Sequence, residues 1–398
     1  MREPQFPRIH LAVDTCFAAG RWSDPRIWAE IVAESGVKAV AVSADCDFDP
    51  LYTEPGWYAV RLNRLKDALN EYGLKVSAFT SGEGTRFMMG FGSPAAAQRQ
   101  YLIERWLTPF AETASALGAG VGWYFQAIPD EILEDPEQYR EARKLVGESV
   151  HRAARAVWSF SCPFAAVGQM YSPGQIPWTI GDTEDFIRQT GIWTILDTGC
   201  QTGQHNFVRP PREELRRGLT EDDPIPYVGT RNAAELYRRA KREYAAGRLS
   251  ELLLDAAEED MDRHPYLFAA PEDGDLYRWL GRLGCFSPII HLQQTDGRAN
   301  TWQPFTRKYN RLGVVRPEKF LVNLKKAYDA PENPGFPPRC RDIWMTVRLR
   351  FPASKITYEV KEELSASVRW WRKFIPEDGL TLDALLTHCK SRDRDFSR

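Results

Sequence analysis

The sequence predicts an α/β protein built as a single (β/α)₈ barrel of the TIM type. The first half of the chain alternates short apolar runs with amphipathic helical stretches four times in succession, which is typical of a parallel sheet covered by helices. The second half continues this alternation, less regularly, to an eighth apolar run and a closing helix. No internal repeat, low-complexity tract or linker rich in Pro and Gly divides the chain, so we expect one domain over residues 1–398.

Each predicted strand is a short apolar run, and the predicted helices have recognisable ends. The strands are expected at Ile9–Asp14, Val37–Val42, Leu74–Phe79, Gly120–Phe125, Pro163–Val167, Trp193–Leu196, Pro288–Leu292 and Asp342–Phe351. The helices are expected at Asp24–Ser35, Tyr58–Tyr72, Pro94–Leu117, Pro136–Trp158 and Tyr358–Phe374. Ser23 and Ser93 are suited to cap helix starts, and Gly73 and Gly118 follow helix ends, where glycine adopts the left-handed conformation easily.

Two segments are longer than the connections of a simple barrel. An insertion of about residues 206–275 follows the sixth predicted strand, and an extended loop of about residues 300–338 follows the seventh. The insertion contains a strongly charged helical stretch, Ala233–Glu259, which we expect on the outer surface with its charges in solvent.

The composition excludes several classes of protein. Lys and Arg number 52 against 54 Asp and Glu, a net charge of −2 that argues against a general nucleic-acid binder. No apolar run approaches the ~20 residues of a membrane helix, and the first residues lack the apolar stretch of a signal peptide. Seven scattered cysteines without a CxxC pair favour the reducing cytoplasm over a zinc ribbon or a disulfide framework. A homo-oligomer is compatible with these features.

The reacting groups of such a barrel lie at the carboxyl ends of its strands and on the loops that follow. Asp197 ends the sixth predicted strand in Leu-Asp-Thr-Gly, and His291 lies near the end of the seventh in Ile-His-Leu. Because these strands are neighbours, the two side chains could share a divalent ion or act as a proton-transfer pair. The alternative is structural: an aspartate that caps its own turn and a histidine bound to a backbone carbonyl.

Further residues at the same ends are weaker candidates for binding a substrate. They are Trp123 and Gln126 at the fourth strand, Gln169 after the fifth, His205 in the insertion, and Arg298 and Trp302 after the seventh. An aromatic ring can stack on a sugar, and an arginine can hold a phosphate or carboxylate. Core packing explains Trp123 equally well, and His205 is also typical of a surface loop.

Three blocks of the sequence resemble the xylose isomerase-like barrels, a family of sugar and sugar phosphate isomerases and epimerases. The blocks are Gln169–Pro173, Asp197–Gly199 and Pro288–Gly297, and the resemblance extends from Ile9 to about Leu385. It implies one divalent cation, Mn²⁺ or Mg²⁺, held by a glutamate on strand five, an aspartate on six, a histidine on seven and a glutamate on eight. The two glutamates would also move the proton of the substrate.

Only half of this ligand set has a counterpart in the chain. Asp197 and His291 stand at the aspartate and histidine positions, but Gly168 and Arg348 stand where the two glutamates belong. Two protein ligands seldom hold Mn²⁺ or Mg²⁺ firmly. We therefore expect weak or absent metal dependence, with the Arg348 guanidinium paired to Asp197 or to an anionic group of the substrate.

Two further positions bear on this site. Cys200 stands where the family often has a histidine that contacts substrate, and a small buried thiol is its simplest interpretation. Glu359 competes with Arg348 for the strand-eight position, although it lies in a helical pattern.

The leading hypothesis is an isomerase- or epimerase-like enzyme that removes a proton next to the carbonyl of a small sugar, sugar phosphate or related compound. In this hypothesis His291 or Asp197 is the base, and Arg348 stabilises the negative charge that develops on the substrate. A second hypothesis is a non-catalytic descendant that binds a sugar or acid, because both glutamates are missing. A third is a glycoside hydrolase or lyase, suggested by the 13 tryptophans on a barrel. It would need two carboxylates across the scissile bond, and the available ones are Asp14, Glu83, Asp197 and Asp296.

Overall fold

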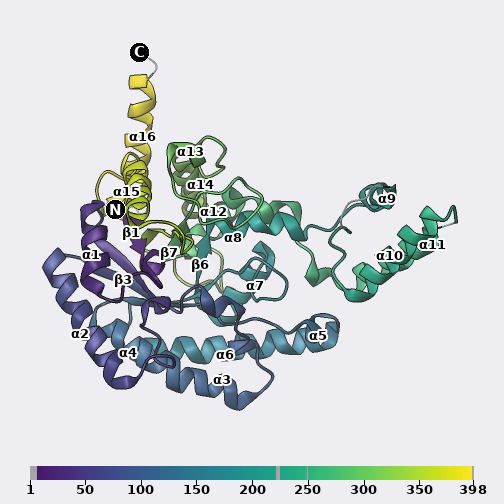
Figure 1. Ribbon diagram of the computed structural model, residues 1–398, viewed down its shortest axis with the longest axis horizontal. Helices are drawn as coiled ribbons and strands as arrows, with labels where there is room; N and C mark the ends of the chain where they lie inside the picture. The colour runs from purple at the N-terminus through teal and green to yellow at the C-terminus, as the bar shows by residue number, and fades with distance from the viewer. Residues whose placement is uncertain (1–6, 221–224, 249, 397–398) are drawn as a thin grey trace.

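The computed structural model describes residues 7–220, 225–248 and 250–396, which form a closed barrel of eight parallel strands surrounded by helices (Figure 1). The strands are β1 (Arg8–Asp14), β2 (Ala39–Ser43), β3 (Lys75–Thr80), β4 (Gly120–Trp123), β5 (Ala165–Gly168), β6 (Trp193–Asp197), β7 (Ile289–Leu292) and β8 (Asp342–Val347). Each strand pairs with the next, and β8 pairs with β1 to close the barrel. The predicted fold class is confirmed.

Helices follow the strands on the outside of the barrel, as the alternation predicts. They are α1 (Pro25–Glu34), α2 (Pro55–Tyr72), α3 (Ala96–Leu102), α4 (Thr108–Ala116), α5 (Asp130–Leu133), α6 (Pro136–Ser159), α7 (Ile180–Thr190), α8 (Thr198–Gly203), α12 (Leu276–Leu283), α14 (Pro317–Asp329) and α15 (Thr357–Arg372). After the barrel, β9 (Leu380–Thr381) pairs antiparallel with β1, and α16 (Leu382–Phe396) extends away from it (Figure 1).

Two expectations about the helices are wrong: one helix is interrupted, and another is capped by a different residue. The helix expected at Pro94–Leu117 is interrupted by a π-helical turn, Ile103–Leu107, between α3 and α4. Pro109 lacks a backbone N–H, so the regular hydrogen-bond ladder cannot run through it. The first helix is capped by the Asp24 side chain, which accepts from the backbone N–H of Arg26, and not by Ser23.

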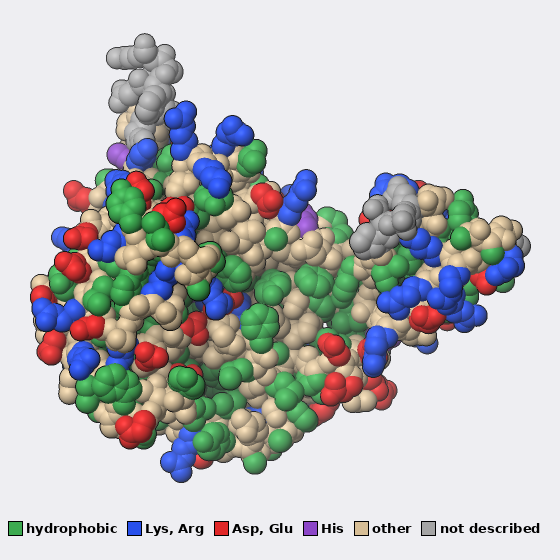
Figure 2. All heavy atoms as spheres, viewed as in Figure 1, with side chains coloured by type: hydrophobic (Ala, Val, Ile, Leu, Met, Phe, Trp, Pro, Cys, Tyr) green, Lys and Arg blue, Asp and Glu red, His purple; other side chains and the backbone are tan. Residues whose placement is uncertain are grey.

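The insertion after β6 forms an arm that projects from the barrel (Figure 1). It contains α9 (Arg212–Thr220), α10 (Arg231–Ala245) and α11 (Glu251–Arg263). The stretch expected as one helix at Ala233–Glu259 is two helices, because the chain turns at Gly247 with a φ of +72°. α10 and α11 pack on each other around a small apolar cluster of their own, and Lys and Arg side chains gather on the visible face of the arm (Figure 2).

The segment expected as an extended loop at about 300–338 contains two helices, α13 (Arg307–Asn310) and α14. α14 packs on α12 and buries Phe320, Leu321, Leu324 and Ala327, which recur at helical spacing. It is therefore the barrel helix between β7 and β8, and the expectation of a plain loop is wrong here.

Alternate residues of each strand face two different cores. On β8, Ile343, Met345 and Val347 join the large core between strands and helices, whereas Trp344 packs on the smaller cluster inside the barrel. All seven cysteines are buried. None of the helices in the described ranges is both long enough and apolar enough to cross a membrane.

Candidate active site

Charged and polar side chains from six of the barrel units meet inside the barrel at the carboxyl ends of the strands. Asp197 ends β6, His291 lies on β7, and Arg348 directly follows β8; all three are buried and within 4 Å of one another. Four more buried side chains complete this group, which we call the interior cluster: Asp14 at the end of β1, Glu83 and Arg86 in the loop after β3, and Tyr124 after β4.

Arg348 crosses the barrel from β8 to the loop after β3. Its Nη2 donates to Glu83 Oε2 at 2.5 Å and its Nη1 donates to His291 Nδ1 at 3.1 Å. Asp197 Oδ2 lies farther from Nη1, at 3.5 Å. The expected pairing with Asp197 is present as this longer contact, and Glu83 is the closer partner of Arg348, because the extended guanidinium reaches past the β6 end.

A second guanidinium, that of Arg86, shares the same carboxylate. Arg86 Nε donates to Glu83 Oε2 at 3.0 Å, and the group lies over the Tyr124 ring, 4.2 Å from its centroid. Burial disfavours ionisation of Glu83, but the charges of Arg348 and Arg86 outweigh it and lower the pKa of this carboxyl below its ordinary value. The two arginines are thus held side by side as fixed positive charges.

Asp197 is almost fully engaged by hydrogen-bond donors. Its Oδ1 accepts from the backbone N–H groups of Gly199 (2.9 Å) and Cys200 (3.3 Å) and from Gln293 Nε2 (2.8 Å). Burial acts against the charged form, but the charges of Arg348 and Arg86 hold the pKa of Asp197 well below its usual range. The carboxylate caps α8, which is the structural role that its sequence context also allows.

His291 is an uncharged ring with its Nε2 side free. Burial and the neighbouring Arg348 charge both lower the pKa of His291. A guanidinium only donates, so the 3.1 Å contact with Arg348 makes His291 Nδ1 an acceptor and leaves the ring hydrogen on Nε2. This Nε2 has no hydrogen-bond partner in the protein and lies 3.8 Å from Asp14 Oδ2.

Asp14 presents an unpaired carboxylate oxygen at the same point. Its Oδ1 accepts from the backbone N–H of Cys16 at 2.8 Å, whereas its Oδ2 has no partner. Arg348 Nε, also without a partner, lies 3.6 Å from this oxygen. Buried polar atoms in proteins are nearly always hydrogen-bonded, so one acceptor and two donors left unpaired together indicate a place for ligand atoms.

These residues do not fit the four-ligand metal site that the family resemblance implies. A Cβ on Gly168 would lie 2.0 Å from Tyr124 Cδ1, so the Tyr124 ring fills the space that a strand-five glutamate would need. Asp197 Oδ2 has a guanidinium nitrogen of Arg348 at 3.5 Å and one of Arg86 at 3.8 Å. A divalent cation would face both positive charges at close range. Across the described ranges, no group of three or more His, Cys, Asp and Glu side chains is arranged to hold a metal ion.

The other candidates from the sequence fall into two groups. Gln126 and Gln169 are fully buried at the carboxyl ends of β4 and β5, beside the interior cluster. Trp123 points the other way and packs on Phe91, with ring centroids 6.4 Å apart, in the core between strands and helices. The structure therefore does not support Trp123 as a stacking platform: Tyr124, one residue later, is the aromatic that faces the barrel interior.

The loop candidates lie outside the interior cluster. His205 is exposed and its ring lies against Gly274, where a Cβ would be 2.5 Å away. Arg298 is also exposed, and Glu359 is exposed on α15, so it is no alternative to Arg348. Trp302 is half-buried with a φ of +47°, and its backbone N–H donates to Gln293 Oε1 at 2.5 Å. Through Gln293, the Trp302 backbone is connected to Asp197.

Sequence reasoning missed the importance of three charged residues. Asp14 and Glu83 are ordinary strand-end carboxylates in the sequence, and Arg86 follows in a Gly-rich turn that resembles no known site. The available signal was their position: Glu83 and Arg86 come within six residues of the end of β3, three apart, and Asp14 is the last residue of β1. Both places lie at the catalytic end of the barrel.

Comparisons with known proteins agree with this architecture, although no family model matches the chain. D-erythrulose 1-phosphate 3-epimerase of Brucella abortus (strain 2308) is 24% identical over 318 residues, which are 79% of this chain and 82% of that protein. The solved structure of a protein provisionally named xylose isomerase, from Rhodospirillum rubrum ATCC 11170, matches with a TM-score of 0.63 at 16% identity, over 91% of this chain and 97% of that one. D-psicose 3-epimerase from Clostridium cellulolyticum H10, solved with D-tagatose, matches with a TM-score of 0.50 at 11% identity, over 91% and 98%.

Proposed function

The chain has the fold of the xylose isomerase-like barrels, and we propose that it is a sugar epimerase- or isomerase-like enzyme. Its substrate in this proposal is a small polyhydroxy carbonyl compound, and its reaction is proton transfer at a carbon next to the carbonyl. The relatives support this class: one is an epimerase of a ketose phosphate and another is an epimerase of a free ketose.

The observation that carries the proposal is the unpaired oxygen of Asp14 between two unpaired donors. Asp14 Oδ2 accepts the proton from the substrate carbon, and the C–H electron pair moves into the enediolate. The N–H groups of Arg348 Nε and His291 Nε2 donate to the carbonyl oxygen as it becomes negative. Return of this proton from Asp14 to the neighbouring carbon forms an isomer, whereas an epimer forms only when a second acid protonates the same carbon from the opposite face.

This assignment moves the base away from the residues that the sequence favours. Asp197 is a poor base, because three donors bind its Oδ1 and its pKa is held low. His291 acts as a donor, because its Nδ1 already accepts from Arg348. The positive charges of Arg348 and Arg86 supply the stabilisation of negative charge that the family assigns to a metal, so no step in this proposal uses one.

The test is hydrogen exchange followed by NMR in D₂O. We expect EDTA-treated protein to incorporate deuterium next to the carbonyl of D-erythrulose, D-erythrulose 1-phosphate or D-psicose. Asp14→Asn should slow this exchange by at least ~100-fold, the usual contribution of a general base. Asp342→Asn is the matched control, since that carboxylate lies at the opposite end of the same barrel.

A second candidate function is binding without turnover, which is favoured by Gly168 and Arg348 at the two glutamate positions. It predicts that these compounds raise the melting temperature of the protein while no deuterium is incorporated. Exchange that is present but indifferent to Asp14→Asn would overturn the assignment of the base. Exchange that appears only after Mn²⁺ or Mg²⁺ is added would overturn the metal-independent mechanism.

A further inference from the structure

We infer that the site takes an uncharged polyhydroxy compound in preference to its phosphate ester, and that the side-chain oxygens of three buried glutamines make this selection. The inference rests on the proposed function and specifies its substrate class. The glutamines are Gln126 after β4, Gln169 after β5 and Gln204 after α8.

All three side chains surround the short segment that leaves β5. Gln126 Nε2 donates to the carbonyl oxygen of Gly168 at 3.2 Å, and Gln204 Nε2 donates to that of Met170 at 3.3 Å. Gln169 Nε2 also donates to the Met170 carbonyl oxygen. Each of the three glutamines is fully buried. They form one group, which we call the glutamine cluster.

The orientation of each amide is determined by these contacts. A backbone carbonyl oxygen only accepts, so the amide end that faces it must be the NH₂ group. The opposite end, Oε1, is therefore an acceptor, and in Gln126, Gln169 and Gln204 it has no hydrogen-bond partner in the protein. Leaving a buried acceptor unpaired is unfavourable, so three in one cluster indicate a ligand that brings hydrogen-bond donors.

The glutamine cluster adjoins the interior cluster through Arg86. Arg86 Nη1 donates to the backbone carbonyl oxygen of Gln169 at 3.4 Å, while Arg86 Nη2 has no hydrogen-bond partner and lies 3.8 Å from Asp197 Oδ2. A ligand whose carbonyl oxygen is bound by guanidinium groups would thus extend its remaining groups toward the glutamine oxygens. Hydroxyl groups match these oxygens, because each hydroxyl carries a hydrogen to donate.

A phosphate group does not match this environment. At neutral pH a phosphate monoester presents mainly acceptor oxygens, which would face the acceptor oxygens of the glutamines. The guanidinium groups of Arg86 and Arg348 already bind Glu83, and with Asp14 and Asp197 the carboxylates of the interior cluster outnumber its two arginines. Arg298, the sequence candidate for an anion, is exposed on a loop.

The first experiment compares D-erythrulose with D-erythrulose 1-phosphate in the D₂O exchange assay. We expect kcat/KM for the free sugar to exceed that for the phosphate by at least tenfold, and the opposite order would overturn the inference. If neither compound exchanges, the proposed function fails, and calorimetric binding of the same two compounds still decides the inference. Tighter binding of the phosphate would then contradict it.

The second experiment removes one glutamine oxygen at a time. Gln169→Met and Gln126→Met should each raise KM for the free sugar about threefold to tenfold, the range for one neutral hydrogen bond, with a smaller change in kcat. Gln294→Met is the matched control: its Nε2 donates to Asn310 Oδ1 at 2.9 Å and its Oε1 accepts from the backbone N–H of Val315 at 3.0 Å. It should lower the melting temperature and leave KM unchanged. Unchanged KM in both site variants would overturn the assignment.

Discussion

Both ends of the barrel hold an aspartate, a histidine and an arginine, but the two groups are built differently. At the amino-terminal end, Asp342 on β8 accepts two hydrogen bonds of 2.9 Å from Arg8 and lies 2.8 Å from His10 Nε2. The His10 ring stacks on Trp344, with centroids 4.4 Å apart. Among the described residues, none of these four side chains has a buried polar atom without a partner. The buried polar atoms of this group therefore leave no hydrogen-bond position for a ligand.

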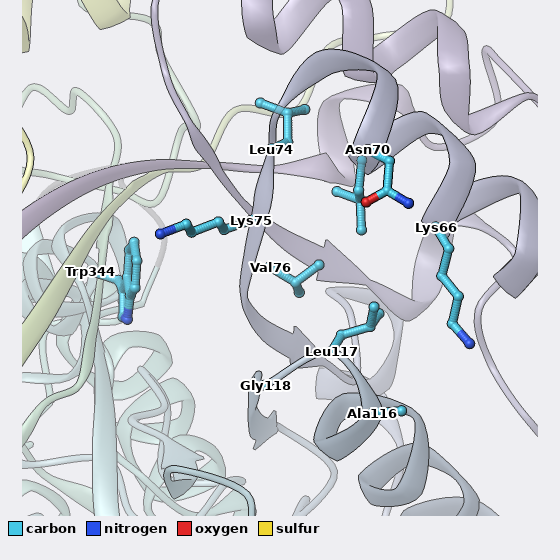
Figure 3. A pocket seen from close by; sticks show the side chains of 10 residues that line it. Lys66, Asn70, Leu74, Lys75, Val76, Ala116, Leu117, Gly118 and Trp344 are labelled. Atoms are coloured by element: carbon cyan, nitrogen blue, oxygen red, sulfur yellow. The ribbon is translucent and has the colours of Figure 1, made fainter.

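At the carboxyl end, each member of the corresponding group keeps an unpaired buried atom. These atoms are Asp14 Oδ2, His291 Nε2 and Arg348 Nε. The residue types are the same at both ends, so residue type alone does not distinguish the two groups, which differ in their unpaired buried atoms. The presence of a pocket does not identify the functional end of the barrel either. An open pocket of about 580 Å³ lies at the amino-terminal end, where Lys75 extends toward Trp344 (Figure 3).

The largest expected difference between the two ends appears when the arginine of each group is replaced by alanine. Arg348→Ala leaves Asp14 as a buried carboxylate without its cation and leaves Glu83 with Arg86 alone, which should lower the free energy of unfolding by about 3–5 kcal/mol and abolish exchange. Arg8→Ala breaks a pair whose arginine side chain is 61% exposed, so we expect a change within ~1 kcal/mol and normal exchange. Urea unfolding and the D₂O assay measure both.

If Arg348→Ala does not fold, Arg348→Lys is the variant to measure in its place. Lysine keeps the positive charge beside Glu83 but cannot present the separate Nε–H and Nη–H donors of a guanidinium. It should therefore restore most of the stability and little of the activity. Equal losses for Arg348→Ala and Arg8→Ala would mean that the two ends do not differ as described.

The fold was predictable because each of its elements carries its own signal. Strands such as Ile9–Asp14 are short apolar runs, and helix ends such as Gly73 carry the residue that the left-handed conformation requires. The errors have local causes: Pro109 interrupts one helix, Gly247 divides another, and the apolar spacing of Phe320, Leu324 and Ala327 was overlooked inside a presumed loop. The single domain over residues 1–398 stays a prediction.

The candidate site was only partly predictable, for a physical reason. Asp197, His291 and Arg348 were found from neighbouring strands, but the Glu83 partner of Arg348 comes from the opposite side of the barrel. Sequence spacing does not indicate how far a guanidinium reaches across an interior. Trp123 was misassigned because successive strand residues face opposite sides, and a shift of one residue exchanges it for Tyr124.

A smaller effect is expected at Gly168, where the chain departs from the glutamate of its relatives' family. Gly168→Ala places a Cβ 2.0 Å from Tyr124 Cδ1, and we expect overpacking to cost about 1–3 kcal/mol of unfolding free energy. Adding Tyr124→Ala should recover part of the stability lost by Gly168→Ala, which a double-mutant cycle in urea measures. Gly181→Ala is the control, since nothing lies within 4 Å of its Cβ position. A neutral Gly168→Ala would show that the tyrosine moves freely and that the family's glutamate position is still available.

The smallest expected effect is a difference in the pH range over which each end of the barrel contributes to stability. Burial and the Arg348 charge lower the pKa of His291, so below about 6.5 the unfolded chain binds a proton that the folded chain excludes. The stability that neutral His291 contributes above pH 6.5 is therefore lost as the pH falls through the folded pKa.

At the other end, burial opposes ionisation of Asp342, but Arg8 and His10 outweigh it and lower the pKa of Asp342. The contribution of ionised Asp342 to stability is therefore lost only below about pH 3.9. Urea midpoints between pH 8 and 5 should fall less in His291→Gln than in the unmodified protein, whereas Asp342→Asn should lower the midpoint throughout this range and lose its effect only below about pH 3.9. A His291→Gln profile parallel to that of the unmodified protein would show that the ring is not buried in its neutral form, and the donor role of its Nε2 would then lose its basis.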